Sequence, residues 1–284
     1  MYPTFIALFN KAGIACAADS DHTIFKLSDK LPVALAVSPK SPIPWDRIIS
    51  DYKRNNPAEQ EFFADYAYSF NEYLVSLEVE ESWSKMAPEI SKIVFFGYGS
   101  EDVLPSVFAT SVLISEDGFL DFDEPFISIV NEENEAFCRV FGDFQSVSTL
   151  FVGSTRKTND YFRYRYKEMF DEYTHRVMEE CKGTGCEDYV MMKIEAFDAE
   201  EEINQILYDA SENRYNELTK GLASFSIGDM VTAAETLFNA NAKLSHLHSG
   251  AKGKHGETKE IAVMTIPEGL TWIKHSIFMR RTEI

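Results

Sequence analysis

The sequence predicts an α+β protein in which two β-sheets are stacked between layers of helix. Strand-like and helix-like segments come in blocks along the chain: strands, two helices, strands, long helices and two final strands. The strand segments are apolar without strict alternation, so at least part of the sheet is expected to be covered on both faces. No low-complexity linker or internal repeat divides the chain. We therefore expect one domain, 1–284, with helical elaborations at about 43–80 and 159–247.

The N-terminal region is expected to form four short strands. The apolar runs at 4–9 and 13–19 are separated by a connection of hairpin size that contains glycine. A second pair of runs, at 23–28 and 32–38, follows directly. Together these four runs indicate that the chain begins with sheet structure.

Two helices are expected next, after a segment rich in proline. Residues 45–54 place apolar side chains on one stripe, and aromatic residues between 62 and 77 recur at intervals of three and four. The first stripe consists of Trp45, Ile48, Ile49 and Tyr52. The second consists of Phe62, Phe63, Tyr66, Phe70, Tyr73, Leu74 and Leu77.

The rest of the chain repeats this order with longer helices. Further strands are expected at 91–99, 105–114, 124–130, 136–142 and 147–154, and a closing pair at 260–266 and 270–276. Between them, helical patterns run from about 159 to 247. Near their start, aromatic residues alternate with basic ones (Tyr161, Phe162, Arg163, Tyr164, Arg165, Tyr166, Lys167). In so acidic a protein we expect an amphipathic helix here, with aromatic side chains inside and cations in solvent.

Composition excludes several classes of partner. The formal net charge of −19 repels both a phosphate backbone and an anionic membrane surface. No run of residues has the roughly 18 consecutive apolar positions of a membrane helix, and the N-terminus lacks the pattern of a signal peptide. We expect a cytoplasmic protein that binds neither nucleic acid nor membrane. His246, His248 and His255 lie in a loop without neighbouring cysteine, and we expect no metal and no cofactor.

The beginning of the chain resembles a known family. The segment Gly13–Ser20, followed by Lys26 before a hairpin and by the apolar run at 32–37, resembles the opening of a proteasome β-type subunit. The strand at 91–99, the strand ending in Gly153-Ser154, the helix from Ile227 and the closing strand pair also resemble that family in their order. Bacterial proteasome-like proteins with extended helices are similar in this respect. The resemblance implies a four-layer αββα sandwich of two mainly antiparallel sheets, the fold of N-terminal-nucleophile (Ntn) hydrolases.

The resemblance also implies a catalytic set. In that family an N-terminal threonine supplies the hydroxyl nucleophile and its own α-amine acts as the base. A lysine stabilises the developing negative charge, and an aspartate holds the lysine charged. Thr4, Asp19 and Lys26 match these roles, and Ser154 and Ser249 are weaker matches for supporting hydroxyls. The alternative from the residues themselves is that Asp19 and Lys26 form a structural ion pair and that Thr4 is an ordinary strand residue.

Two departures from the family pattern bear on activity. Proline stands at position 3, where members that process themselves commonly have glycine, and His246 stands where the family has aspartate. These departures favour a catalytically silent protein that acts in assembly or partner binding. One alternative is a threonine-type peptidase that uses Thr4 after removal of residues 1–3 and takes a peptide or protein substrate. A second alternative is a small-amide hydrolase of the Ntn class. Because proteasome-type subunits associate into rings, the resemblance also implies that this chain can form a homo-oligomer, with the extended helices either serving that association or blocking it.

Overall fold

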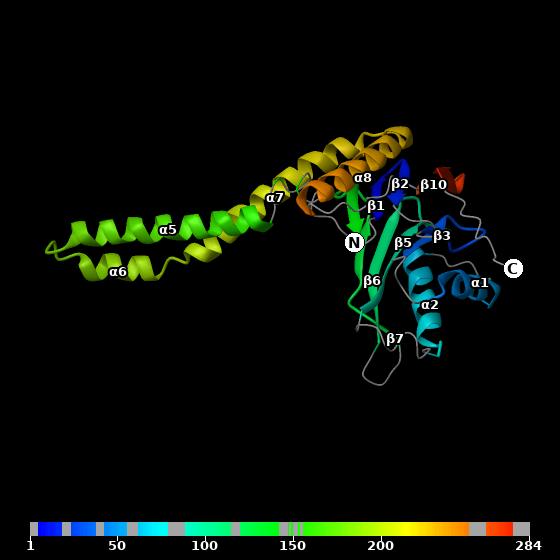
Figure 1. Ribbon diagram of the computed structural model, residues 1–284, viewed down its shortest axis with the longest axis horizontal. Coiled ribbons are helices and arrows are strands. Elements are labelled where there is room, and N and C mark those ends of the chain that lie inside the picture. Colours follow the sequence, from blue (N-terminus) through cyan, green and yellow to red (C-terminus); the bar gives the residue numbers. More distant parts are fainter. Residues whose placement is uncertain are drawn as a thin grey trace. The chain divides into compact units, whose positions relative to one another are not determined.

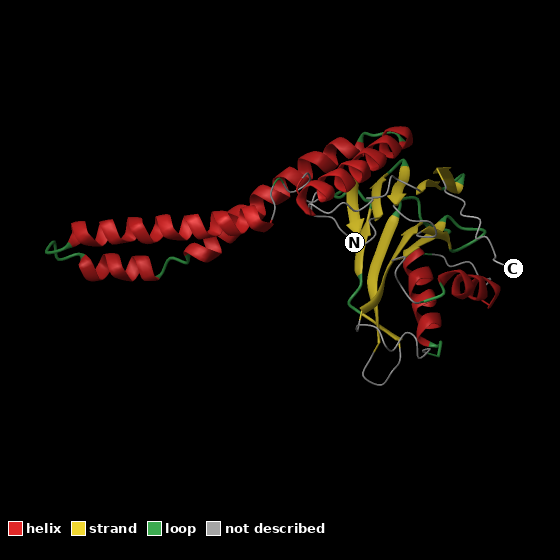
Figure 2. Ribbon diagram, in the orientation of Figure 1, coloured by secondary structure: helices red, strands yellow, loops and turns green. Residues whose placement is uncertain are grey.

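The computed structural model divides the chain into two compact units, where the sequence predicts one domain. The first unit comprises Met1–Val147 and Thr219–Ile284, and the second comprises Ser148–Leu218. The structure describes residues 5–18, 24–37, 43–55, 62–78, 89–114, 120–141, 147, 149, 153, 156–249 and 260–274. Figure 2 shows that the strands belong to the first unit, whereas the described elements of the second unit are helices.

The first unit contains two sheets whose described strand pairs are all antiparallel. The first sheet has the strand order β11-β10-β2-β1-β9, and in the second sheet the order is β3-β4-β5-β6-β7, with β8 also paired to β6. The strands of the first sheet are β1 (Phe5–Asn10), β2 (Gly13–Ala18), β9 (Ala136–Phe141), β10 (Glu260–Thr265) and β11 (Gly269–Lys274). Those of the second are β3 (Ile24–Lys26), β4 (Val33–Val37), β5 (Glu89–Gly97), β6 (Ser106–Ile114), β7 (Leu120–Phe122) and β8 (Phe126–Ile129).

Helices cover the outer faces of these sheets. Helix α8 (Ile227–Ser249) packs on β1, β2 and β10 of the first sheet, as Figure 1 also shows. Helices α1 (Trp45–Asn55) and α2 (Phe63–Val75) share a buried cluster with β4, β5 and β6 of the second sheet. The arrangement is an α+β fold compatible with a sandwich, in agreement with the predicted class.

Contact between the two sheets explains why their strands lack strict alternation. The ring centroid of Phe5 in β1 lies 5.7 Å from that of Phe96 in β5. Every residue of β1, β2 and β4 is buried. A strand with one face on another sheet and one face under a helix has no solvent face, so apolar residues occupy both sets of alternate positions.

The predicted stripe of α1 is confirmed, because Trp45, Ile48, Ile49 and Tyr52 are all buried. In α2 the predicted residues Phe63, Tyr66, Phe70 and Leu74 are also buried, but Phe62 is not part of the buried stripe. Phe62 precedes the first helical residue and its side chain is 52% exposed. The predicted spacing of three and four residues in α2 is therefore correct, but its first residue, Phe62, is not buried.

The strand expected at 147–154 is wrong where the structure describes it. Val147 and Thr149 are helical, and the Gly153 N–H donates to the Thr149 carbonyl at 2.9 Å, which is the spacing of an α-helical turn. A short apolar run has the same composition in a buried helix as in a buried strand, so its periodicity does not separate the two.

The second unit consists mainly of three helices. Helix α5 (Arg156–Cys181) is followed by α6 (Glu187–Glu195) and α7 (Ala199–Ala223), whose last residues belong to the first unit. Figure 1 shows α6 running back alongside α5. The expectation that the aromatic residues of α5 are buried is wrong: the side chains of Tyr161, Phe162 and Tyr164 are 60%, 50% and 60% exposed. The unit has too few helical layers to enclose them.

Glycine is required at position 97, at the end of β5. Gly97 has φ +145°, and a Cβ atom there would lie 2.0 Å from the Pro32 carbonyl oxygen. The same carbonyl accepts a hydrogen bond from the Tyr98 N–H at 3.0 Å. This close approach joins the end of β5 to the loop that precedes β4.

Asn10 ties the β1–β2 hairpin to the turn between α7 and α8. Its fully buried side chain donates from Nδ2 to the carbonyls of Leu222 and Phe225, both at 2.9 Å, and its Oδ1 accepts the Ala12 N–H at 2.8 Å. We expect Asn10→Ala to lower the free energy of unfolding by about 1–3 kcal/mol, because it removes the donor to both carbonyls.

Asn10→Asp is expected to destabilise more than Asn10→Ala at pH 7, because a buried carboxylate faces two carbonyl oxygens. Urea denaturation of both variants checks this order, with Lys11→Ala, a change at an exposed neighbour, as the control. If all three variants unfold at the same urea concentration, the bridging role assigned to Asn10 is wrong.

Candidate functional site

The start of β1, the end of β2 and the start of β10 meet in one cross-strand row of the first sheet. Phe5 pairs with Ala18, and Ala18 pairs with Glu260. In the sequence Thr4 directly precedes Phe5 and Asp19 directly follows Ala18. Thr4 and Asp19 themselves lie outside the described residues.

A second row, in the other sheet, contains Lys26. Lys26 in β3 pairs with Ala34 in β4, and Ala34 pairs with Phe96 in β5. Residues directly opposite each other in an antiparallel sheet project from the same face. Because the Phe96 ring contacts Phe5 of the first sheet, the residues of this row belong to the face between the two sheets.

The ammonium group of Lys26 pairs with a carboxylate of its own loop. Its Nζ lies 3.9 Å from Asp29 Oδ1, and the Lys26 side chain is 47% exposed. Lys53 of α1 donates to the same oxygen at 2.7 Å. The hydrogen bond from Lys53 is the largest cause that lowers the pKa of Asp29, and the charge of Lys26 adds to it. Asp29 is therefore a carboxylate shared by two lysines.

Beneath this ion pair the loop is held by hydroxyl groups. Ser28 Oγ accepts the N–H of Lys30 at 3.2 Å and of Leu31 at 3.0 Å. The buried Tyr66 of α2 is hydrogen-bonded to Ser28, and burial raises the pKa of Tyr66 to about 12. The Tyr66 hydroxyl is therefore neutral at physiological pH and acts as a support, not as an acid or base.

The remaining predicted residues are not brought together by the described part of the structure. Ser154 lies outside it, and Ser249 is the last residue of α8, with its side chain outside it. The side chains of His246 and His248, and residue 255, also lie outside the described part. Among the side chains that are described, no group of three or more His, Cys, Asp or Glu residues is placed to hold a metal ion.

Sequence reasoning missed two carboxylates near this region. Glu260 is fully buried at the start of β10, and its cross-strand pairing places it on the face between the sheets. Burial raises the pKa of the nearby Cys16 thiol, and the negative charge of Glu260 raises it further. Glu260 stands at the edge of an apolar run, where an acidic residue is usually in solvent, so the sequence held no signal for its burial. For Asp29 a signal existed, since it lies three residues after Lys26.

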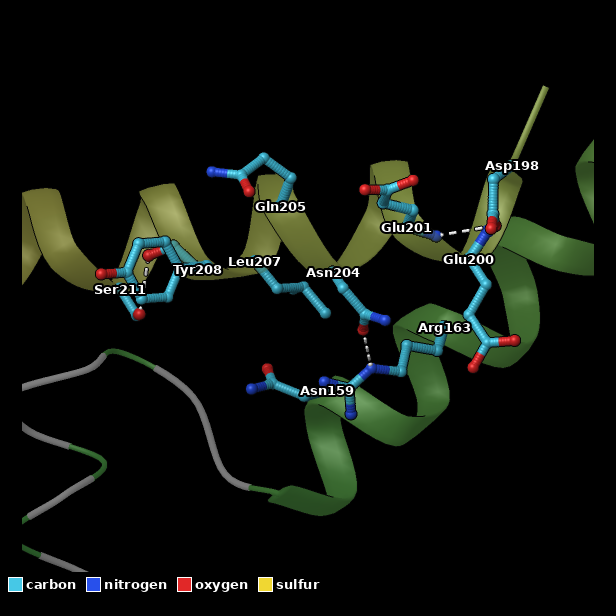
Figure 3. Close-up of a pocket in the computed structure, with 10 residues that line it drawn as sticks. All are labelled: Asn159, Arg163, Asp198, Glu200, Glu201, Asn204, Gln205, Leu207, Tyr208 and Ser211. Atoms are coloured by element: carbon cyan, nitrogen blue, oxygen red, sulfur yellow. Dashed lines mark hydrogen bonds between the residues drawn. The ribbon is translucent and has the colours of Figure 1, made fainter. Parts of the chain in front are cut away.

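A separate groove lies within the second unit, between α5 and α7 (Figure 3). Arg163 Nε donates to Asn204 Oδ1 across it at 2.7 Å, and Asp198, Glu200, Glu201 and Tyr208 are among the other lining residues. The groove is polar and open, and no nucleophile–base pair is present among its ten lining residues.

The chain matches no model of a protein family and no curated protein sequence. Within the described ranges, no helix is both long enough and apolar enough to cross a membrane.

The shared carboxylate gives a prediction about stability and pH. We expect Asp29→Asn to lower the free energy of unfolding by about 0.2–1 kcal/mol at pH 7, the range of exposed ion pairs. A carboxyl whose pKa is lowered in the folded state contributes stability above its unfolded pKa and loses it as pH falls through the folded pKa. The difference between wild type and Asp29→Asn should therefore vanish in acid.

Urea denaturation at pH 7 and in acid measures this difference, and Lys53→Met should lose a similar amount. Glu124→Gln, a change at an exposed carboxylate, serves as the control. A difference for Asp29→Asn that persists unchanged in acid would show that its effect does not come from the charge.

Proposed function

We propose that this protein has the proteasome-β-like fold of the Ntn hydrolases and is catalytically silent, with a role in assembly or in binding a partner protein. Two stacked antiparallel sheets, with α8 on one and α1 and α2 on the other, support the fold. The resemblance of Gly13–Ser20 and Lys26 to the family's opening supports it from the sequence.

The observation that carries the silent reading is the environment of Lys26. A lysine that stabilises developing negative charge acts best in a site from which water is excluded, held by a carboxylate of its own. The Lys26 side chain is half exposed, and among the described residues the carboxylate that pairs with it, Asp29, is hydrogen-bonded to Lys53 at the shorter distance of 2.7 Å. Pro3 before Thr4, and His246 in place of aspartate, point the same way.

A second candidate, a threonine-type peptidase that uses Thr4 after removal of residues 1–3, is favoured by the strand registers. Phe5 and Ala18, the neighbours of Thr4 and Asp19 in the sequence, lie in one row, and Lys26 lies in a row of the facing sheet. The contact between Phe5 and Phe96 joins these rows. Such an arrangement is the one a nucleophile, a carboxylate and an ammonium group need.

Intact-mass analysis of the purified full chain, before and after treatment with an epoxyketone or β-lactone probe, separates the two candidates. A silent protein keeps residues 1–3 and gains no adduct. A peptidase loses these residues and gains one probe molecule on Thr4, and either change in mass would overturn the silent reading.

Variants assign the chemistry if an adduct forms. Thr4→Ala should abolish it because the nucleophile is absent, and Lys26→Met should slow it about 100-fold or more if the ammonium stabilises charge in the transition state. Asp29→Asn, which changes the loop carboxylate and keeps Lys26, is the matched control. Equal slowing by Lys26→Met and Asp29→Asn would mean that the loop is needed and that Lys26 has no role of its own.

A further inference from the structure

The helical unit, defined here as the described residues of α5, α6 and α7 up to Leu218, has almost no core of its own. Among these residues Ile203 is the one buried apolar side chain. Most of the large apolar side chains on its helices are exposed to 42% or more: Tyr161, Phe162, Tyr164, Met169, Tyr173, Tyr189, Met191, Met192, Ile206, Tyr208 and Leu218. Helices in proteins are stabilised mainly by packing of an apolar face, so this unit requires a further layer.

Three exposed apolar residues of α5 and the partly buried Tyr166 form a stripe. Phe162, Tyr166, Met169 and Tyr173 follow one another at intervals of four, three and four residues, which places them on one side of the helix. The first three line a groove together with Ile203, Ile206 and Leu207 of α7. This apolar groove adjoins the polar groove of Figure 3, which Arg163 and Asn204 line, and the two grooves share Leu207.

Basic residues of α5 lie mostly before the centre of this stripe and acidic residues mostly after it. Residues 156–167 contain five basic and one acidic residue, and residues 168–181 contain one basic and five acidic residues. The same point, between 167 and 168, lies midway between Phe162 and Tyr173 and midway between Tyr166 and Met169. The helix is therefore complementary to a second copy of itself that runs in the opposite direction.

Direction matters for the electrostatic energy. In an antiparallel pair the basic half of each α5 faces the acidic half of the other, whereas a parallel pair opposes like charges. A two-fold axis through the centre of the stripe places the basic half of each α5 opposite the acidic half of the other, as in an isologous dimer. A nucleic acid fits poorly, because the acidic half of α5 and the acidic first turn of α7 (Glu200, Glu201 and Glu202) repel it.

We propose that two copies of this chain associate through the apolar grooves of their helical units, with the two α5 helices antiparallel, to form a helical bundle. Each copy supplies α5 and the returning α6 and α7, so four helical layers enclose the apolar stripes. The proposal rests on this unit alone and stands whether or not the protein hydrolyses a peptide.

A charge-exchange experiment on the full chain tests it. One variant carries Arg165→Glu and Lys167→Glu, and the other carries Glu168→Lys and Glu172→Lys. Each alone loses the attraction between halves, so we expect its dimer dissociation constant by analytical ultracentrifugation to rise about tenfold or more. An equimolar mixture should associate more tightly than either variant alone, because an acidic half of one again meets a basic half of the other.

A second pair of variants separates this surface from others. Met169→Glu in the apolar groove should abolish dimer formation with helical content unchanged by circular dichroism, and Tyr208→Ser in the polar groove should leave dimer formation unchanged. A wild-type chain that stays monomeric, a dimer that survives Met169→Glu, or a mixture that gains no affinity would each overturn the proposal. The intact-mass test of hydrolysis reads a different quantity, so the two proposals fail independently.

Discussion

The apolar contact between the two sheets is the constraint from which the rest of the first unit follows. The strands β1, β2 and β4 are buried at every residue, so both faces of each strand must be covered by other elements. One face is covered by the other sheet, where Phe5 meets Phe96, and the outer face by helices. Once the sheets are stacked, strand alternation determines which side chains point into the space between them. The cross-strand rows of Glu260 and Lys26 belong to that space for this reason.

Local features of the fold were predictable from the sequence, and pairing between distant segments was not. The β1–β2 hairpin, the buried stripe of α1 and the closing strand pair follow from neighbouring residues. The pairing of β1 with β9, and of β2 with β10, joins segments more than a hundred residues apart, and no residue pattern encodes it. Lys26 was predicted as a site residue, and its contact with Asp29, three residues further along the chain, is local, whereas the burial of Glu260 depends on the pairing of β10 with β2. The exposed aromatic residues of α5 were predicted to be buried because periodicity indicates an apolar face without showing what covers it.

The two charged residues in the cross-strand rows, Glu260 and Lys26, have very different electrostatic environments. Glu260 has no exposed surface, so its charge acts at a low effective dielectric constant and raises the pKa of Cys16 through the protein interior. The Lys26 side chain is half exposed and that of Asp29 is mostly exposed, and an ion pair in contact with solvent contributes little to stability. Whether a lysine ammonium group is catalytic or structural depends more on its exposure to solvent than on its residue type. The position of Lys26 in the fold suits the first role, and its surroundings suit the second.

The contact at Gly97 has an evolutionary consequence. Any side chain at this position overlaps a backbone oxygen, and the backbone there has a torsion angle that other residues rarely adopt. We therefore expect substitutions at position 97 to impair folding whatever the protein does. In a collection of diverged homologues, glycine at this position should persist even in lineages that have lost the original activity, and it should serve to align their sequences when the charged residues have drifted.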